Sequence, residues 1–365
     1  KPGYLPNDEV YSFDASYTDQ TLELLAFSEE ISNQPTITEF TKVDLTGGQE
    51  IEGAKMQILD QDGKVVEEWV SKKEPHVVYA LEPGEYVLHE EQAPTEQGYV
   101  RAEDVKFVVE ETGDVQKVKM EDDHTKVSIS KTDITDGKEI EGAKLQILDQ
   151  DGEVVESWTT GEEHLIEYLP IGTYTLHEEA AVDGYIVAND VEFTVEETGE
   201  IQKVKMEDER AMGQLVIVKT DTDSKTALEG VEFVLLEKET GEEVGRLKTG
   251  KDGKAVSELL PIGTYENGVF KEPITYVLKE TATLKGYEKT EEEWEIVFTY
   301  QNDKTPVIEV VKEIQNKKIP ETPGTVKPGP KTGDDTNWFL PLLALGVSAG
   351  MVAGLLYYRK RHKKA

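Results

Sequence analysis

Short runs of alternating apolar and polar residues dominate most of the chain. In "QLVIVKTD", Leu215, Ile217 and Lys219 share one face of an extended strand, because successive side chains of a strand point to opposite sides. "KVSISKTD" and "TEFTKVD" repeat this pattern and direct Lys131 and Lys42 toward the apolar side. An unpaired ammonium in a protein core is very costly, so each of these strands needs a reason for its lysine.

Turn signals separate the strands. The Asp-Gly step in "DQDG" is typical of a β-hairpin, and Pro and Gly in "LEPGEY" and "LPIGTY" indicate turns that lead into the next strand. Helical periodicity is weak before residue 338. The pattern therefore predicts an all-β fold of antiparallel β-sandwiches.

The chain repeats itself. "EIEGAKMQILDQDGKVVEEW", which begins at Glu50, returns at Glu139 with three substitutions, and a more divergent third copy contains "ALEGVEFVLLEKETGEEV". The inward lysines lie 89 and 88 residues apart, a period that fits tandem globular modules. "KPGYLPNDEVYSF" at the start is similar to "QGYVRAEDVKF" within the first full copy. We predict the C-terminal part of a truncated module at 1–36 and full modules at 37–123, 124–212 and 213–319.

The C-terminal segments have a different composition. Residues 320–333 are rich in proline and predict an extended spacer. Within 334–365, residues 338–358 carry no charge and are long enough to cross a bilayer as one transmembrane helix. The basic "RKRHKK" that follows would remain cytoplasmic. The acidic part of the chain would then lie outside the membrane.

The charge and the absence of cysteine exclude several classes of function. With 75 acidic and 39 basic residues, the net charge is −36, which argues against nucleic-acid binding and suits a soluble surface protein. Without cysteine there are no disulfides and no thiol chemistry. "DQDG" lacks the spacing of an EF-hand loop, so it is read as a turn and no metal or other cofactor is predicted. Since no Ser/His/Asp set or phosphate loop is recognisable either, we expect no enzyme.

Two further polar positions in each module share a face with apolar residues. Alternation in "YVLHEE", "YTLHEE" and "YVLKET" turns a glutamate inward, and alternation in "VKMED" and "VKEIQNKK" turns an aspartate or asparagine inward on the closing strand. These residues are Glu90, Glu178 and Glu280, with Asp122, Asp208 and Asn316. The neighbours Asp123 and Glu209, and Asn302 in the third module, are alternative candidates for the closing position.

Such a trio permits amide formation. Burial lowers the pKa of a lysine and raises that of a glutamate, so a neutral amine can attack the side-chain carbonyl while the glutamate relays protons. The product would be an intramolecular isopeptide bond between the first and last strands, which can be neighbours in a sandwich. The alternative reading is a set of buried salt bridges, or charges that reach solvent at strand ends.

The modules resemble the Cna B-type (SpaA-like, prealbumin-like) domains of Gram-positive surface proteins and pilins. The resemblance rests on "FTKVD", "ISKTD" and "IVKTD" and on "YVLHEEQAPTEQGY" with its two counterparts. It implies a compact β-sandwich and a Lys–Asn or Lys–Asp isopeptide bond aided by Glu. Asn33 would be the acceptor in the truncated module. The implied trios are Lys42, Glu90 and Asp122; Lys131, Glu178 and Asp208; and Lys219, Glu280 and Asn316.

The stretch "GPKTGDD" precedes the apolar span and resembles an LPxTG-like sorting signal, with Gly329 where that motif has leucine. The resemblance implies that sortase recognises Pro330, cuts between Thr332 and Gly333, and joins Thr332 to peptidoglycan or to a pilin. The alternative is a simple transmembrane anchor.

Together these features predict a structural stalk of a secreted, adhesin-type surface protein that is anchored covalently to the cell wall. Its partners would be sortase and peptidoglycan, with the membrane only before sorting and without nucleic acid. Two alternatives are a minor or basal pilin, which would bind other pilins, and repeats that bind host extracellular matrix.

Overall fold

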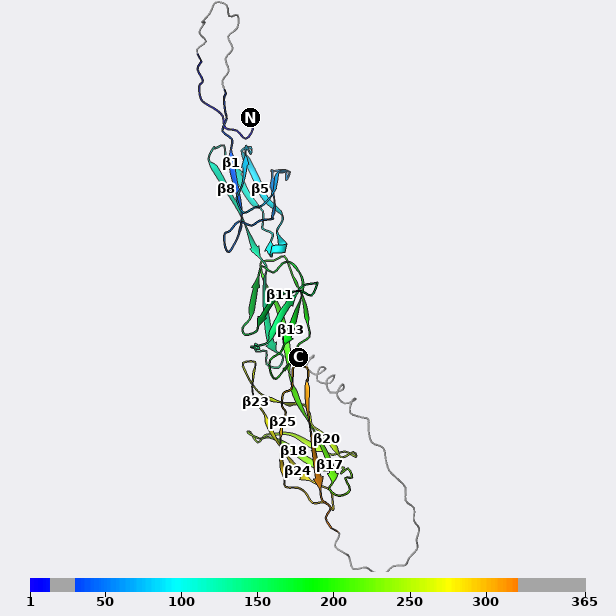
Figure 1. The fold of residues 1–365 in the computed structure, drawn as a ribbon. Coiled ribbons are helices and arrows are strands. Elements are labelled where there is room, and N and C mark those ends of the chain that lie inside the picture. Colours follow the sequence, from blue (N-terminus) through cyan, green and yellow to red (C-terminus); the bar gives the residue numbers. More distant parts are fainter. Residues whose placement is uncertain (14–29, 321–365) are drawn as a thin grey trace, which may run out of the picture. The chain divides into compact units, whose positions relative to one another are not determined.

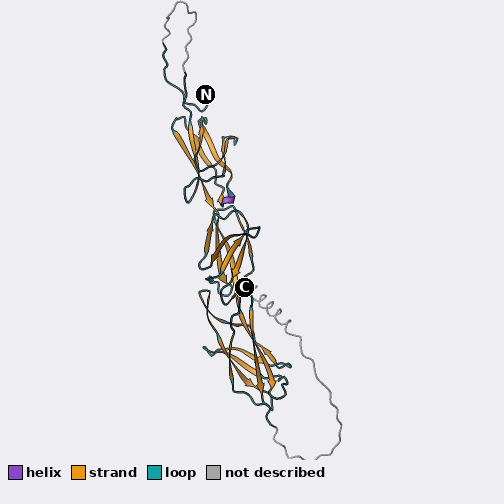
Figure 2. Cartoon of the chain, viewed as in Figure 1, coloured by secondary structure: helices purple, strands orange, loops and turns teal. Residues whose placement is uncertain are grey.

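The computed structural model describes residues 1–13 and 30–320. Within this part of the chain, strands form nearly all the regular structure, and a single turn of 3-10 helix, η1 (Thr95–Gln97), is the exception (Figure 2). The prediction of an all-β chain of tandem sandwiches is therefore confirmed. The strands divide into three modules, each with its own pair of four-stranded sheets.

Module 1 comprises β1 to β8. One sheet has the order β4 (His76–Tyr79), β1 (Ile37–Asp44), β8 (Val115–His124), β6 (Tyr99–Val100); the other has the order β3 (Val65–Val70), β2 (Lys55–Leu59), β5 (Gly84–Gln92), β7 (Val105–Val109). Phe40 from the first sheet packs with Met56, Ile58 and Leu88 from the second. The alternating apolar faces of the two sheets thus meet in one core, as the sequence pattern predicts.

Module 2 comprises β9 to β16 and repeats this arrangement. Its sheets have the orders β12 (His164–Glu167), β9 (Lys126–Asp133), β16 (Ile201–Arg210), β14 (Tyr185–Ile186), and β11 (Val154–Thr159), β10 (Lys144–Leu148), β13 (Gly172–Ala180), β15 (Val191–Val195). The turn between β10 and β11 closes with a hydrogen bond from the Asp149 amide to the Glu153 carbonyl, and Gly152 has a positive φ of 80°. The predicted "DQDG" hairpin is confirmed here and, through Gly63, in module 1.

Module 3 comprises β17 to β26 and carries an additional hairpin. One sheet joins β20 (Lys254–Val256), β17 (Met212–Asp221), β21 (Leu260–Pro261) and β26 (Val307–Asn316); the other joins β19 (Glu243–Lys248), β18 (Glu232–Glu237), β24 (Thr275–Ala282) and β25 (Glu293–Val297). The hairpin β22 (Gly263–Glu266) and β23 (Val269–Pro273) is formed by the insertion "YENGVFKEPIT".

The prediction of purely antiparallel sheets is wrong at one pair in each module. The first and last strands, β1 and β8, β9 and β16, and β17 and β26, run parallel, whereas the other strand pairs that the structure describes are antiparallel. Figure 1 labels β1 and β8, the parallel pair of module 1. Parallel first and last strands let the chain enter a module at one end and leave it at the other. Only Thr125 separates β8 from β9, and only Ala211 separates β16 from β17.

No helix in residues 1–13 and 30–320 is long and apolar enough to cross a membrane. The predicted span at 338–358 and the residues Pro330, Thr332 and Gly333 lie outside the described residues.

Candidate functional site

Register between the first and last strands brings the predicted residues together. In module 1, Asp44 of β1 pairs with Asp122 of β8, and Lys42 lies two residues before Asp44 on the same face. Lys42 and Asp122 are therefore diagonal neighbours on the inner side of the sheet. The glutamate comes from the opposite sheet, on β5, where Glu90 pairs with Met56. The site thus joins both layers of the sandwich.

The three side chains of module 1 are in direct contact. The Lys42 Nζ contacts Asp122 Oδ1 and lies 2.9 Å from Glu90 Oε2. The Ala102 amide donates a hydrogen bond of 2.8 Å to the same glutamate oxygen. Lys42 is 3% exposed, while Glu90 and Asp122 are fully buried. The alternative in which these charges reach solvent at strand ends does not fit this burial.

Module 2 reproduces the arrangement. The Lys131 Nζ contacts Asp208 Oδ1 and lies 2.9 Å from Glu178 Oε2, which also accepts a hydrogen bond of 2.6 Å from the Ala188 amide. Asp208 pairs in register with Asp133, as Asp122 does with Asp44. The two modules therefore hold the same trio in the same geometry.

Module 3 holds an amide in place of the acid. The Lys219 Nζ donates to Asn316 Oδ1 and lies 2.9 Å from Glu280 Oε2. Asn316 Nδ2 donates a hydrogen bond of 2.6 Å to Glu280 Oε1. Asn302, the alternative acceptor, is exposed and accepts hydrogen bonds from Lys304 and Thr305. The structure therefore places Asn316, not Asn302, beside the lysine.

The other two alternatives also lie away from the lysines. Asp123 is partly exposed, accepts a hydrogen bond of 2.7 Å from Lys126 Nζ, and lies on the opposite face of β8 from Asp122. Glu209 occupies the corresponding position beside Asp208 and pairs with Ile186 of β14.

Burial changes the protonation of the acceptor acids. It raises the pKa of Asp122 to about 7, against the opposing effect of Lys42; the charge of Glu90 and a hydrogen bond with it raise the pKa further. Asp208 behaves in the same way, also with a pKa of about 7. Burial lowers the pKa of Lys219, while Glu280 acts in the opposite sense. Burial thus favours the neutral acid at Asp122 and Asp208 and the neutral amine at Lys219, because the charged forms are poorly solvated there.

One buried carboxylate in each module escaped the sequence reasoning. Asp44 Oδ1 accepts hydrogen bonds of 2.7 and 2.6 Å from the Thr46 and Gly47 amides. Burial raises its pKa, but hydrogen bonds from Gly47, Tyr168 and Thr46 more than offset this, so the pKa of Asp44 is lowered. Asp133 and Asp221 likewise accept hydrogen bonds from backbone amides of the turns that follow the first strands of modules 2 and 3. The Lys-x-Asp pattern, which recurs in all three first strands, is the sequence feature that could have predicted these buried aspartates.

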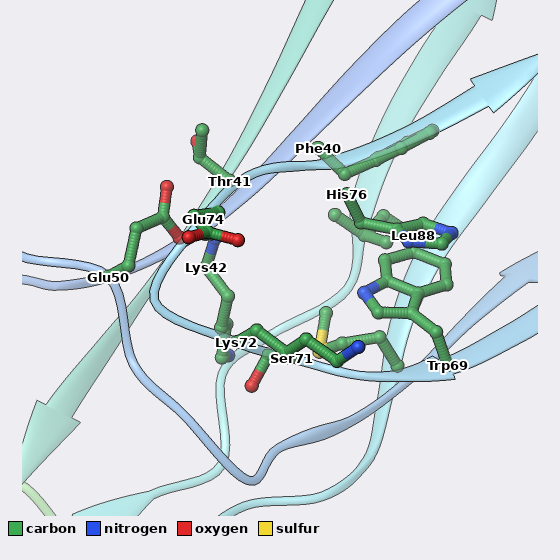
Figure 3. Close-up of a pocket in the computed structure, with 11 residues that line it drawn as sticks. Phe40, Thr41, Lys42, Glu50, Trp69, Ser71, Lys72, Glu74, His76 and Leu88 are labelled. Carbon is green, nitrogen blue, oxygen red and sulfur yellow. Dashed lines mark hydrogen bonds between the residues drawn. The ribbon is translucent and has the colours of Figure 1, made fainter.

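A small cavity adjoins the lysine of module 1. It measures about 10 Å³ and is lined by residues that include Lys42, Ser71 and Met56. Figure 3 shows the Lys42 side chain with Glu50 on one side of it and Trp69 on the other. By this measure the space is at most that of a single water molecule, so bulk water does not surround the amine.

No group of three or more His, Cys, Asp or Glu residues in the described part of the chain is arranged to hold a metal ion.

Comparison with known proteins gives one family match. The family SpaA, described as a prealbumin-like fold domain, matches residues 36–124, 125–210 and 213–272, more than half of the chain. No curated protein sequence matches significantly.

The chain is also similar to solved structures. The Bacillus anthracis TIE protein is 27% identical with a TM-score of 0.52, over 78% of this chain and 51% of that one. This chain therefore spans about half the length of that protein. BcpA, the major pilin subunit of Bacillus cereus, is 16% identical with a TM-score of 0.44, over 77% of this chain and 99% of its own. The shaft pilin SpaA from Lactobacillus rhamnosus GG is 15% identical with a TM-score of 0.22, over 55% and 99%.

Proposed function

The chain belongs to the SpaA family of prealbumin-like fold domains, and from this premise we propose that it is a structural stalk whose modules are closed by intramolecular isopeptide bonds. The bonds would join Lys42 to Asp122, Lys131 to Asp208 and Lys219 to Asn316. The observation that carries the proposal is the contact of a buried lysine with both a buried glutamate and a buried acceptor, found three times in one chain. Paired ions alone do not explain this burial, since desolvating an ion pair often costs more than its attraction returns.

The chemistry in the two aspartate modules balances without a cofactor. Neutral Lys42 Nζ attacks Cγ of Asp122 in its acid form, which accepts a nucleophile far better than a carboxylate does. Glu90, 2.9 Å from the amine, takes a proton from the nitrogen and delivers it to the departing hydroxyl. One C–N bond forms, one C–O bond breaks and water leaves. The pKa of about 7 for Asp122 keeps a large share of the acid form near neutral pH.

In module 3 the leaving group is ammonia. Lys219 Nζ attacks Cγ of Asn316, and Glu280 carries a proton from the attacking nitrogen to Nδ2, which already donates to Glu280 Oε1 at 2.6 Å. One C–N bond forms, another C–N bond breaks and ammonia departs. The same glutamate therefore contacts both the nitrogen that enters and the nitrogen that leaves.

The position of the bonds suits a protein under tension. A pulling force enters a module through its first strand and leaves through its last, and these are the two strands that each bond would join. The linked residues are 80, 77 and 97 positions apart. By the loop-entropy relation used for disulfides, closing loops of this length stabilises a module by about 4–5 kcal/mol.

Mass spectrometry tests the cross-links directly. We expect the purified 365-residue chain to be lighter than its sequence by two waters and one ammonia, with peptides that join each lysine to its predicted acceptor. The two leaving groups distinguish the acid modules from the amide module. A chain of unmodified mass would refute the cross-links, and peptides linked through Asp123, Glu209 or Asn302 would reassign the acceptors.

We retain the proposed domain division, and the first 36 residues have specific support. The Thr36 amide donates to the Gly3 carbonyl, as the Thr125 amide donates to Gly98 at the end of module 1. Both glycines have positive φ, and in both places a β-carbon would collide with backbone of the module that follows. Tyr4 forms a β-bridge with Pro35, and at the end of module 1 Tyr99 pairs with His124 in the same way. Pro35 therefore corresponds to His124, and Asn33, two residues earlier, corresponds to Asp122. Residues 14–29 lie outside the described part of this segment.

Anchoring to the cell wall through sortase is the second part of the proposal, and it rests on the sequence around Pro330 and Thr332. In a Gram-positive host with sortase, we expect the chain in the cell-wall fraction, and Thr332→Ala should move most of it to the membrane fraction. Thr325→Ala, in the same spacer, is the matched control. Equal wall association of Thr332→Ala would contradict the sorting motif. A ladder of high-mass species for the unchanged chain would favour the alternative, a pilin.

A further inference from the structure

Besides the acceptor, the three sites differ at a position that lies three residues after the glutamate in each module. Glu90, Glu178 and Glu280 occupy matching places, since they pair with Met56, Leu145 and Phe233 across the same two strands of their modules. Three residues after the glutamate, the modules with an aspartate acceptor have alanine, at Ala93 and Ala181. The module with an asparagine acceptor has Thr283.

Thr283 contacts the acceptor itself. Its Oγ1 accepts a hydrogen bond of 2.7 Å from Asn316 Nδ2, which also donates 2.6 Å to Glu280 Oε1. Both N–H groups of the carboxamide are therefore satisfied, although Asn316 is only 2% exposed. A buried N–H without an acceptor is costly, and a carboxylic acid at the same place has no second donor to satisfy. Ala93 and Ala181, which have no hydroxyl, occupy this position in the two modules whose acceptor is an aspartate.

The glutamate is held differently in the two kinds of module. Backbone amides of Ala102 and Ala188 donate to Glu90 and Glu178. Among the described residues no backbone amide donates to Glu280: its Oε2 lies 2.9 Å from Lys219 Nζ, and its Oε1 accepts the hydrogen bond from the Asn316 amide. The orientation of the Asn316 carboxamide consequently decides the geometry of the whole site.

We propose that Thr283 is a positioning residue that matches module 3 to an amide acceptor. Its hydroxyl holds the carboxamide with Oδ1 toward Lys219 Nζ and Nδ2 toward Glu280. A flipped carboxamide would turn its donors toward the lysine and remove the leaving nitrogen from its proton source. The inference rests on the proposed cross-link: the amine of Lys219 replaces Nδ2 on Cγ, Glu280 transfers the proton, and ammonia leaves from beside Thr283.

The test compares rates of cross-linking within one chain. The full chain is synthesised in a short cell-free pulse, and the fraction of each linked peptide is followed by mass spectrometry. Thr283→Val keeps the shape but removes the hydroxyl, and we expect it to slow the Lys219–Asn316 bond about tenfold. Thr283→Ser should form the bond near the original rate. Modules 1 and 2 serve as internal controls that must lose water at unchanged rates.

A double variant separates positioning from a general effect on folding. In Thr283→Val/Asn316→Asp, the acceptor has no second N–H, so the threonine hydroxyl is not needed, and the bond should form as fast as in Asn316→Asp alone. In module 2, adding Ala181→Thr to Asp208→Asn should speed the Lys131–Asn bond relative to Asp208→Asn alone.

The outcomes keep the two proposals apart. A normal rate in Thr283→Val, or equal slowing in the presence of Asn316→Asp, overturns the role of Thr283 while modules 1 and 2 still lose water. Absence of linked peptides from all three modules of the unchanged chain overturns the cross-linked stalk itself.

Discussion

Glu178→Gln is expected to leave Lys131 and Asp208 unjoined, so that the chain retains one water that the unchanged protein loses. Glutamine has the shape of glutamate but cannot take a proton from the amine, which lies 2.9 Å from Glu178 Oε2 in the structure. The free energy of unfolding of module 2 should fall by about 4–5 kcal/mol, because the unfolded chain without the cross-link has more conformational entropy.

Intact mass and scanning calorimetry measure the two effects together. Modules 1 and 3 should keep their bonds and their thermal transitions, and Glu179→Gln, an exposed neighbour, is the matched control. A Glu178→Gln chain that still loses water in module 2 would show that the glutamate is dispensable. A lost bond without a lower transition temperature would show that the cross-link adds no thermodynamic stability.

Lys131→Met is expected to destabilise module 2 still more than Glu178→Gln at pH 8. Both variants lack the bond, but Lys131→Met also leaves Glu178 and Asp208 buried without a cation. Removing one partner of a buried ion pair typically costs about 3–5 kcal/mol. We therefore expect the free energy of unfolding of module 2 to be lower in Lys131→Met than in Glu178→Gln by this additional amount.

This difference in stability between Lys131→Met and Glu178→Gln should disappear as the pH falls. The pKa of Asp208 is about 7 in the folded protein and is raised from 3.8, so the folded state holds its proton more tightly than the unfolded state does. Lys131 opposes that rise, and its removal moves the pKa of Asp208 higher still. The stability of Lys131→Met should therefore increase from pH 8 toward pH 4. Unfolding midpoints across this range provide the measurement, and a constant gap between the two variants would contradict the buried-charge explanation.

Much of this architecture follows from local sequence. The two-residue period in "QLVIVKTD" defines the inner face of β17, and with it the burial of Lys219 beside Leu215 and Ile217. The same alternation turns Glu280 and Asn316 inward. A strand's side chains alternate whatever it pairs with, so burial of these residues could be predicted without knowing the sheet order.

The tertiary structure decided which strands meet, and in which direction. Lys219 and Asn316 are 97 residues apart, and alternation is the same for parallel and antiparallel neighbours. β17 and β26 pair in parallel with Asp221 opposite Asn316, so Lys219, two residues before Asp221, is the diagonal neighbour of Asn316. Asn302 lies outside β26 and therefore outside the site. The hydrogen bond from Asn316 to Thr283 likewise depends on how the second sheet packs over the first. A sequence pattern records which side of a strand is buried, whereas the partner on that side is chosen by the packing of the two sheets.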